Sequence, residues 1–249
     1  TYVVLLVLLG FVLHQTIGRH STLVQQQRDF VTAVSHELRT PLSSIRLQAE
    51  MLQNKPGVEE VESLKRGLSR IVQDEERLMR LVEMILTSTR IERKELELHV
   101  EEASPSVALE RAIAHARSQY PQRSVEFDDQ SQGAIAKVDL AVAEQLFYNL
   151  IDNALKYSKE GAQPVNVTLS RSGDSLRAEI KDQGCGIAQK ELKGVFQRFY
   201  RGARANEFGA GTGLGLWLCD TYASMLGWKL DIESTLGQGT CVSVEMSML

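Results

Sequence analysis

Two apolar stripes, one on either side of a turn, constrain the fold of this chain more than any other feature. The first stripe covers 30–52 and the second 58–85, and most of their apolar residues are three or four positions apart. This spacing places them on one face of a helix. Residues 54–57, Asn-Lys-Pro-Gly, are a strong turn signal. The pattern therefore predicts an antiparallel hairpin of two long helices.

One such hairpin cannot cover its own apolar surface. Pairing with a second copy would bury that surface in a four-helix bundle, so we expect a homodimer. In the alternative interpretation, the domain that follows covers the surface instead.

Beyond Arg93 the pattern changes to mixed strands and helices. Hairpin-like strand pairs beside helices predict an α+β sandwich with its helices on one sheet face. The whole chain is thus expected to be α+β, with a helical hairpin before an α/β sandwich. The expected strands are 96–100, 124–127, 134–138, 165–170, 176–181, 229–233 and 240–245, and the clearest helices are 107–119 and 140–157.

Composition narrows the function classes. The chain has 249 residues, of which 43% are hydrophobic and 24% charged, as in globular proteins of one or two domains. The net charge of −4 gives no reason to expect nucleic acid as a partner. The three cysteines are too few and too scattered for a disulfide framework or a zinc site.

An uncharged apolar segment, 2–13, lies at the start of the sequence. Twelve helical residues rise only about 18 Å, less than the roughly 30 Å of a bilayer core. We interpret residues 1–14 as the cytoplasmic end of a truncated transmembrane helix and 15–28 as a linker helix. This predicts a protein of the inner (cytoplasmic) membrane whose later domains face the cytoplasm. A signal-peptide core and a buried helix are the alternatives.

His36 lies off the apolar face of the first helix, because two helical steps rotate it by about 200° from the nearest apolar positions. Thr40 shares its face and Glu37 is adjacent. Pro41 should bend the helix, because it cannot donate to the carbonyl of Glu37. An exposed imidazole beside a carboxylate is a candidate nucleophile. The alternative is an ordinary solvated histidine.

The helix expected at 140–157 carries an unusual polar face. Gln145, Asn149, Asn153 and Lys156 fall on one side of it. Amide oxygens suit a hard cation, and amide and ammonium groups can donate to phosphate oxygens. A merely hydrated surface is the alternative.

Two glycine-containing segments follow. Residues 182–187 read Asp-Gln-Gly-Cys-Gly-Ile after an expected strand, and the carboxylate there can accept from an amino group such as that of adenine. Residues 208–216 alternate glycine with other residues and run into an apolar helix, which predicts a phosphate-binding loop. The loop matches neither a Walker A motif nor a dinucleotide fingerprint. A last Gly-Gln-Gly-Thr, 237–240, enters the final strand as a tight turn.

Together these motifs resemble those of the sensor histidine kinases of two-component signalling, over about residues 25–249. The matching segments are 35–42 (phosphoacceptor box), 149–158 (N box), 182–187 (first glycine box), 196–201 (F box), 211–215 (second glycine box) and 237–240 (closing glycine turn). The resemblance implies a dimerisation and histidine phosphotransfer domain at 29–96. It also implies a catalytic ATP-binding domain at 97–249, of the Bergerat type shared with gyrase-type and Hsp90-type ATPases.

The resemblance further implies a reaction. His36 would take the γ-phosphoryl group of Mg-ATP, and Glu37 would hold or deprotonate the imidazole. The phosphoryl group would then pass to an aspartate of a separate response regulator. Thr40 would help to position water when the protein dephosphorylates that regulator.

ATP and Mg²⁺ are the implied cofactors. Asn149 would bind Mg²⁺, and Asp182 would accept from the adenine amino group. All implied nucleotide-site positions are Asn149, Asn153, Lys156, Tyr157, Asp182, Gly184, Gly186, Ile187, Gly209, Gly211, Thr212, Gly213, Leu214, Gly215 and Thr240.

Gln145 argues against rapid ATP hydrolysis. In the related ATPases this helix position commonly carries a glutamate that activates water, and an amide cannot act as that base. Two alternative functions are an ATPase in which His36 is only a surface residue, and a non-catalytic membrane-linked dimer that binds nucleotide as a scaffold.

Overall fold

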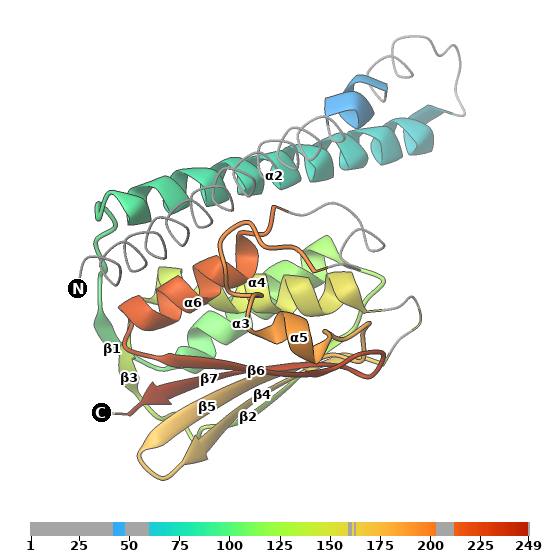
Figure 1. Cartoon of the computed structure of the whole chain (residues 1–249). Coiled ribbons are helices and arrows are strands. Elements are labelled where there is room, and N and C mark those ends of the chain that lie inside the picture. Colours follow the sequence, from blue (N-terminus) through green and yellow to red (C-terminus); the bar gives the residue numbers. More distant parts are fainter. Residues whose placement is uncertain (1–41, 48–59, 159–160, 162, 203–211, 249) are drawn as a thin grey trace, which may run out of the picture.

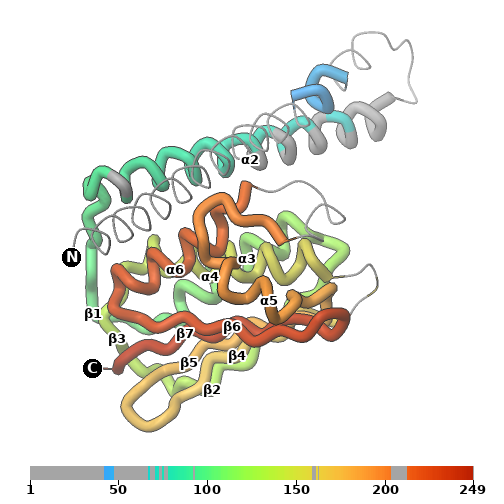
Figure 2. Tube along the Cα trace, viewed as in Figure 1, coloured from blue at the N-terminus to red at the C-terminus, as the bar shows by residue number. Residues whose placement is uncertain are grey.

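A computed structural model describes residues 42–47, 60–158, 161, 163–202 and 212–248. A long helix, α2 (Glu60–Glu92), lies over a layer of helices, and that layer covers one face of a sheet (Figure 1; Figure 2). The architecture is α+β, as predicted. Among the described residues no helix is both long and apolar enough to cross a bilayer. The predicted membrane segment at 1–14 and the linker helix at 15–28 lie outside those residues, as do His36, Glu37 and Thr40.

The main sheet has five strands in the order β2-β4-β5-β7-β6. Only the pair β2–β4 is parallel, and the other neighbours are antiparallel. The register places Val167 opposite Ile180, and Ile180 opposite Val242, so these apolar side chains share the face that the helices cover. The strands are β2 (Val125–Gln130), β4 (Val165–Ser172), β5 (Ser175–Lys181), β6 (Lys229–Thr235) and β7 (Gly239–Ser247).

The helices on this sheet are α3 (Pro105–Gln119), α4 (Leu140–Tyr157), α6 (Gly215–Met225) and the short α5 (Gln189–Leu192). A second, two-stranded sheet pairs β1 (Glu101–Ala103) with β3 (Ala136–Val138). We call residues 101–248 the sandwich domain.

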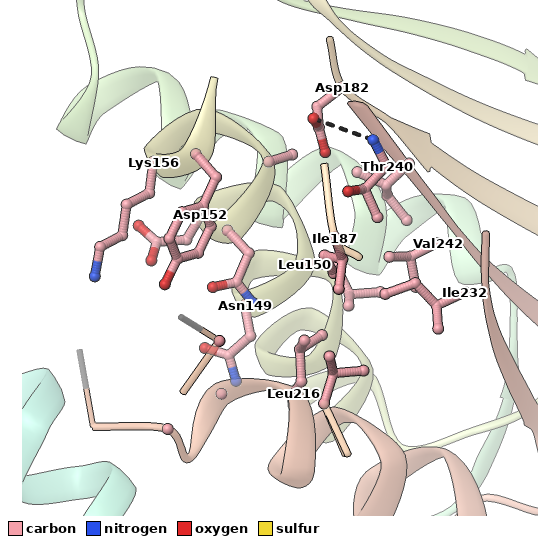
Figure 3. A pocket seen from close by; sticks show the side chains of 18 of the residues that line it. Asn149, Leu150, Asp152, Lys156, Asp182, Ile187, Leu216, Ile232, Thr240 and Val242 are labelled. Atoms are coloured by element: carbon pink, nitrogen blue, oxygen red, sulfur yellow. Dashed lines mark hydrogen bonds between the residues drawn. The ribbon is translucent and has the colours of Figure 1, made fainter. Parts of the chain in front are cut away.

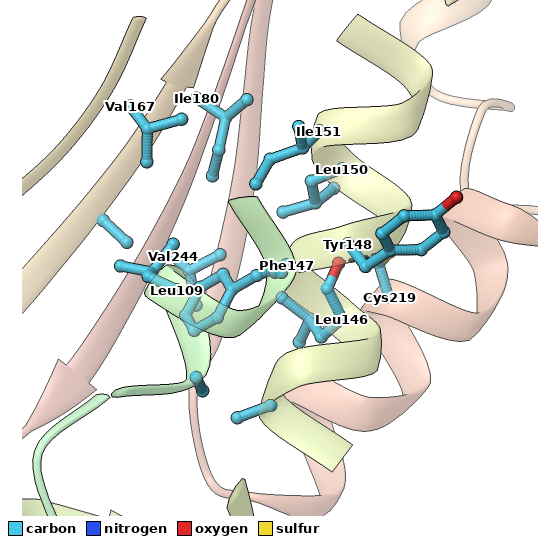
Figure 4. Close-up of a cluster of buried hydrophobic side chains, with 14 of the residues drawn as sticks. Leu109, Leu146, Phe147, Tyr148, Leu150, Ile151, Val167, Ile180, Cys219 and Val244 are labelled. Atoms are coloured by element: carbon cyan, nitrogen blue, oxygen red, sulfur yellow. Dashed lines mark hydrogen bonds between the residues drawn. The ribbon is translucent and has the colours of Figure 1, made fainter. Parts of the chain in front are cut away.

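Helix α4 is the centre of the core (Figure 4). Its side chains Leu146, Phe147, Leu150 and Ile151 are at most 2% exposed and lie among residues of the sheet, α3 and α6. Burying one such side chain stabilises the fold by about 1.5–3 kcal/mol. This packing fixes the rotation of α4 about its axis, and therefore the direction of its polar face.

Asp139 explains where α4 begins. Its Oδ1 accepts from the backbone N–H groups of Ala141 and Val142, at 3.1 Å each, which caps the helix. Its Oδ2 accepts from the backbone N–H of His99 at 2.7 Å.

The strand predicted at 96–100 is wrong. That segment is irregular, and β1 begins at Glu101. The alternation arises because Leu96 packs against the core, while the N–H of His99 bonds to a carboxylate instead of a neighbouring strand.

The described half of the hairpin presents two apolar faces. Met84, Ile85 and Ile91 of α2 pack against the sandwich domain. Val72, Met79 and Leu86 are 53%, 48% and 53% exposed and recur every seven residues. The sandwich domain therefore covers one face of α2 and leaves the other exposed.

Candidate functional site

A cavity of about 640 Å³ lies beside α4, with walls from residues 182–187, the start of α6, and strands β6 and β7 (Figure 3). Leu150, Ile187, Ile232 and Val242 form an apolar side of it. The polar side includes Asn149, Asp152, Lys156, Asp182 and Thr240. An apolar slot with a few converging polar groups is typical of a ligand site, and the volume is within the usual range of roughly 300–1,000 Å³.

The polar face of α4 points into this cavity, since Gln145, Asn149, Asn153 and Lys156 all line it. Asn149 is 7% exposed, and its Oδ1 accepts from Gln145 Nε2 at 3.2 Å. Its buried Nδ2 has no oxygen or nitrogen partner within the described part of the chain, and only the thiol of Cys219 lies near it. Because an unsatisfied buried amide costs free energy, this group indicates a position for a ligand.

Asp182 directly follows β5 and is 8% exposed. Its Oδ1 accepts from the backbone N–H of Gly184 at 2.7 Å and from that of Thr240 at 3.3 Å. Burial raises the pKa of this carboxyl, although the two hydrogen bonds oppose the shift. Since both bonds use Oδ1, the other oxygen can accept from a ligand donor.

The loop after Asp182 passes between the end of α4 and the turn that joins β6 to β7. Its backbone is held by Cys185 N, which donates to Tyr157 O at 3.1 Å, and by Ile187 N, which donates to Ser234 Oγ at 2.8 Å. Gly186 has a φ of +61°, and a Cβ there would overlap the carbonyl oxygen of Thr235. Only glycine fits this position without a shift of the backbone.

The second glycine segment is described from Thr212 onward, and Gly209 and Gly211 lie outside the described residues. Thr212, Gly213 and Gly215 line the cavity. Because α6 begins at Gly215, the partial positive charge of its N-terminus lies at the cavity wall.

Two of the predicted site residues that the structure describes do not line the cavity. Leu214 is fully buried in the core, and its backbone N–H bonds to Thr212 Oγ1 at 3.3 Å. Gly184 instead supports the site through its bond to Asp182.

Lys156 and Tyr157 form the end of the cavity at the last turn of α4. The Lys156 Nζ lies 5.7 Å from the centroid of the Tyr157 ring, a cation–π distance.

The donor set fits Mg-ATP. The apolar side accommodates an aromatic base, while the amides, Lys156 and the α6 N-terminus can bind phosphate oxygens. No cluster of three or more His, Cys, Asp or Glu side chains able to hold a metal occurs among the described residues. Mg²⁺ commonly uses one or two protein oxygens plus substrate phosphates. Asn149 can supply one such oxygen when its side-chain amide is flipped, so that Oδ1 and Nδ2 exchange places.

Several lining residues were not predicted. Tyr120 OH donates to Asp152 Oδ1 at 2.7 Å, and burial together with this carboxylate raises the pKa of Tyr120. Arg80 of α2 also lines the cavity, and its Nη2 donates to Gln119 Oε1 at 3.0 Å. Asp152 could have been found, because it lies three residues after Asn149 on the same helix. Nothing in the sequence indicated Arg80.

Comparison with known families gives two matches. Residues 139–248 match the family described as "Histidine kinase-, DNA gyrase B-, and HSP90-like ATPase". Residues 26–94 match the "His Kinase A (phospho-acceptor) domain".

Individual proteins agree with these matches. The chain is 31% identical over 224 residues to Sensor protein SrrB of Staphylococcus aureus. The aligned region covers 89% of this chain and 38% of SrrB. The chain thus spans about two fifths of that curated relative.

Among solved structures, Acinetobacter baumannii histidine kinase AdeS matches with a TM-score of 0.58 and 23% identity, over 86% of this chain and 98% of that one. Full-length ShkA in complex with AMPPNP matches with a TM-score of 0.60 and 22% identity, over 89% of this chain and 46% of that one. These likenesses concern the fold.

Proposed function

The chain belongs to the sensor histidine kinases, and on that premise we propose that it moves the γ-phosphoryl group of Mg-ATP to His36 and then to an aspartate of a response regulator. The observation that carries the proposal is the cavity, in which the amide row of α4 and the Asp182 carboxylate converge. Phosphoryl transfer depends on positioning and charge stabilisation, so one domain can hold the nucleotide while another presents the nucleophile.

In this proposal the sandwich domain is the ATP-binding domain. The free oxygen of Asp182 accepts from the adenine amino group, with Ile187, Ile232 and Val242 against the base. Lys156, Asn153 and the backbone at 213–215 face the phosphates. Asn149 is the proposed Mg²⁺ ligand, and the cation offsets negative charge on the phosphates.

His36 supplies the nucleophile. An imidazole with a pKa near the usual value of about 6.5 is largely neutral at pH 7. One ring nitrogen attacks the γ-phosphorus, the bond from that phosphorus to the β–γ bridging oxygen breaks, and ADP leaves. The proton on the other ring nitrogen passes to the carboxylate of Glu37, which is adjacent in the sequence. In a second reaction, the hydrolysis that dephosphorylates the regulator, Thr40 would position the attacking water.

Gln145 supports transfer to His36 over transfer to water. It lines the cavity and donates to Asn149, at the helix position where the related ATPases commonly carry a water-activating glutamate. An amide cannot accept the proton of that water, and hydrolysis of ATP should therefore be slow.

We also propose a homodimer through the hairpin, with residues 29–96 as the phosphotransfer domain and 97–249 as the catalytic domain. The exposed apolar repeat of Val72, Met79 and Leu86 supports this dimer, since a seven-residue repeat is typical of a helix-bundle seam. The apolar segment at 2–13 is the proposed attachment to the inner membrane, with both domains on the cytoplasmic side.

Incubation of the chain with γ-labelled ATP and Mg²⁺ tests this function. We expect acid-labile, alkali-stable label on the protein, and none on His36→Gln. The matched control is His99→Gln, in the irregular segment between α2 and β1, which should label like the wild type. Steady phosphate release without labelled protein would favour an ATPase, and nucleotide binding with neither would favour a scaffold.

A further inference from the structure

The cavity does not belong to the sandwich domain alone. Arg80, Leu81 and Met84 of α2 contribute to its lining, together with Gln119 and Tyr120 at the end of α3. The second helix of the hairpin therefore closes one side of the site that we assign to the nucleotide.

Arg80 is the cationic residue of this α2 segment, and its only hydrogen bond within the described part of the chain is to a neutral group. Its Nη2 donates to the Gln119 side-chain oxygen at 3.0 Å. Within those residues Arg80 forms no salt bridge with a carboxylate. A guanidinium has five N–H donors in a planar fork that matches the oxygens of a phosphate. The described residues therefore leave most of these donors for an anion in the cavity.

The charged side chains of the described lining balance one another, so binding of an anion depends on each cation among them. Asp152 lies on the neighbouring wall, where Tyr120 OH holds its Oδ1 at 2.7 Å, and Arg80 is close enough to Tyr120 to lower its pKa. In the described lining, three acidic residues, Asp152, Asp182 and Glu191, balance three basic ones, Arg80, Lys156 and Arg201. A triphosphate adds negative charge that this balanced lining does not offset, so each cation near it contributes to binding.

We propose that Arg80 is a phosphate-binding residue of the nucleotide site, supplied by the hairpin. A bound triphosphate then connects α2 to the sandwich domain, and adenosine, which has no phosphate, does not. By linkage, a triphosphate stabilises the docked position of α2 to the same extent that docking strengthens triphosphate binding. The inference rests on the proposed function, because it requires the cavity to bind a nucleotide.

The test compares two ligands on the whole chain, Mg-AMPPNP and adenosine, by isothermal titration calorimetry. In Arg80→Met we expect the Kd of Mg-AMPPNP to rise about tenfold, the effect of roughly one charge-assisted hydrogen bond, with the Kd of adenosine unchanged. Arg80→Lys should be intermediate, because it keeps the charge without the fork. Arg90→Met, an exposed arginine later on the same helix, is the matched control and should bind both ligands normally.

Adenosine serves as an internal measure of correct folding. An unchanged Kd of Mg-AMPPNP in Arg80→Met would overturn the inference, and so would an equal weakening of both ligands, which indicates a purely structural role. Either result leaves the proposed function intact if the wild type binds Mg-AMPPNP. A wild type that binds neither ligand would refute the proposed nucleotide site itself.

A second measurement follows the docking of α2. Amide hydrogen exchange at 80–91 should be slower with Mg-AMPPNP than with adenosine in the wild type, and this difference should vanish in Arg80→Met. The same difference in the mutant would contradict the coupling.

Discussion

Asp182→Asn should separate nucleotide binding from folding. The substitution keeps the size of the side chain and one carbonyl oxygen. That oxygen can still accept from the N–H groups of Gly184 and Thr240, which now bond to Oδ1 at 2.7 and 3.3 Å. The new amide nitrogen must then occupy the place of Oδ2. It would present a donor to the adenine amino group, which is also a donor.

The expected magnitude follows from that mismatch. A hydrogen bond to a charged group contributes about 1.5–3 kcal/mol, so the Kd of Mg-AMPPNP should rise roughly 10- to 150-fold. The burial of Asp182, at 8% exposure, places the loss at the upper part of this range, because water cannot replace the missing acceptor.

The pH dependence has a defined sign. Burial raises the pKa of Asp182, so folding favours its protonated form, and its contribution to stability is present at acid pH and lost as the pH rises through the raised pKa. At neutral pH the charged carboxylate therefore costs stability, and Asp182→Asn should unfold at equal or higher denaturant concentration. Nucleotide binding has the opposite trend, because it weakens as acid protonates Asp182.

Calorimetric titration with Mg-AMPPNP and urea unfolding at neutral pH provide the two readouts. Asp174→Asn, in the exposed turn between β4 and β5, is the matched control and should change neither. Binding by Asp182→Asn within threefold of the wild type would refute the role of this carboxylate. Weaker binding accompanied by a lower urea midpoint would show that the substitution acts through folding.

Three further substitutions test the structure around the site. Gly186→Ala should lower both the Tm and nucleotide affinity, because its Cβ would overlap the Thr235 carbonyl, and an unchanged Tm would contradict the observed backbone. Arg198→Ala should speed amide exchange in the last turns of α2, because Arg198 Nη2 donates to Ser88 Oγ at 2.5 Å; unchanged exchange would mean that this contact does not hold α2. Phe147→Ala should lower the free energy of unfolding by about 3–5 kcal/mol, measured with urea. A loss under 1 kcal/mol would contradict the complete burial of this side chain in the core.

Local patterns were enough to predict much of the sandwich domain. The helix expected at 140–157 has those bounds in the structure, and its polar residues line the cavity. In the structure the helix begins just after Asp139, whose carboxylate caps it. The alternating strands at 165–170 and 176–181 were likewise found, each slightly longer than expected.

Pairing between distant segments could not be predicted in the same way. The sequence suggested hairpin-like pairs, but β2 pairs in parallel with β4, across the whole of α4. The alternation at 96–100 imitated a strand, although the backbone of His99 bonds to Asp139, 40 residues later. Alternation of apolar and polar residues indicates which side chains are buried. It does not identify the segment with which the backbone forms hydrogen bonds.

The contribution of α2 to the site had no sequence signal. Arg80 occupies an ordinary polar position of an amphipathic helix, and only the docking of that helix brings it to the cavity. Ser88 is similar, since it is 1% exposed and bonds to Arg198, 110 residues away. Contacts of this kind depend on how two domains meet, which periodicity within either one does not encode.

We propose above that nucleotide bound in this cavity phosphorylates His36. The most direct test of this proposal is peptide mass spectrometry at alkaline pH after the chain has been incubated with Mg-ATP, comparing the wild type with Asn149→Ala. We expect one phosphorylated peptide in the wild type, with the phosphoryl group on His36, and none in the variant. Phosphate on another residue, or an equally phosphorylated His36 in Asn149→Ala, would contradict it.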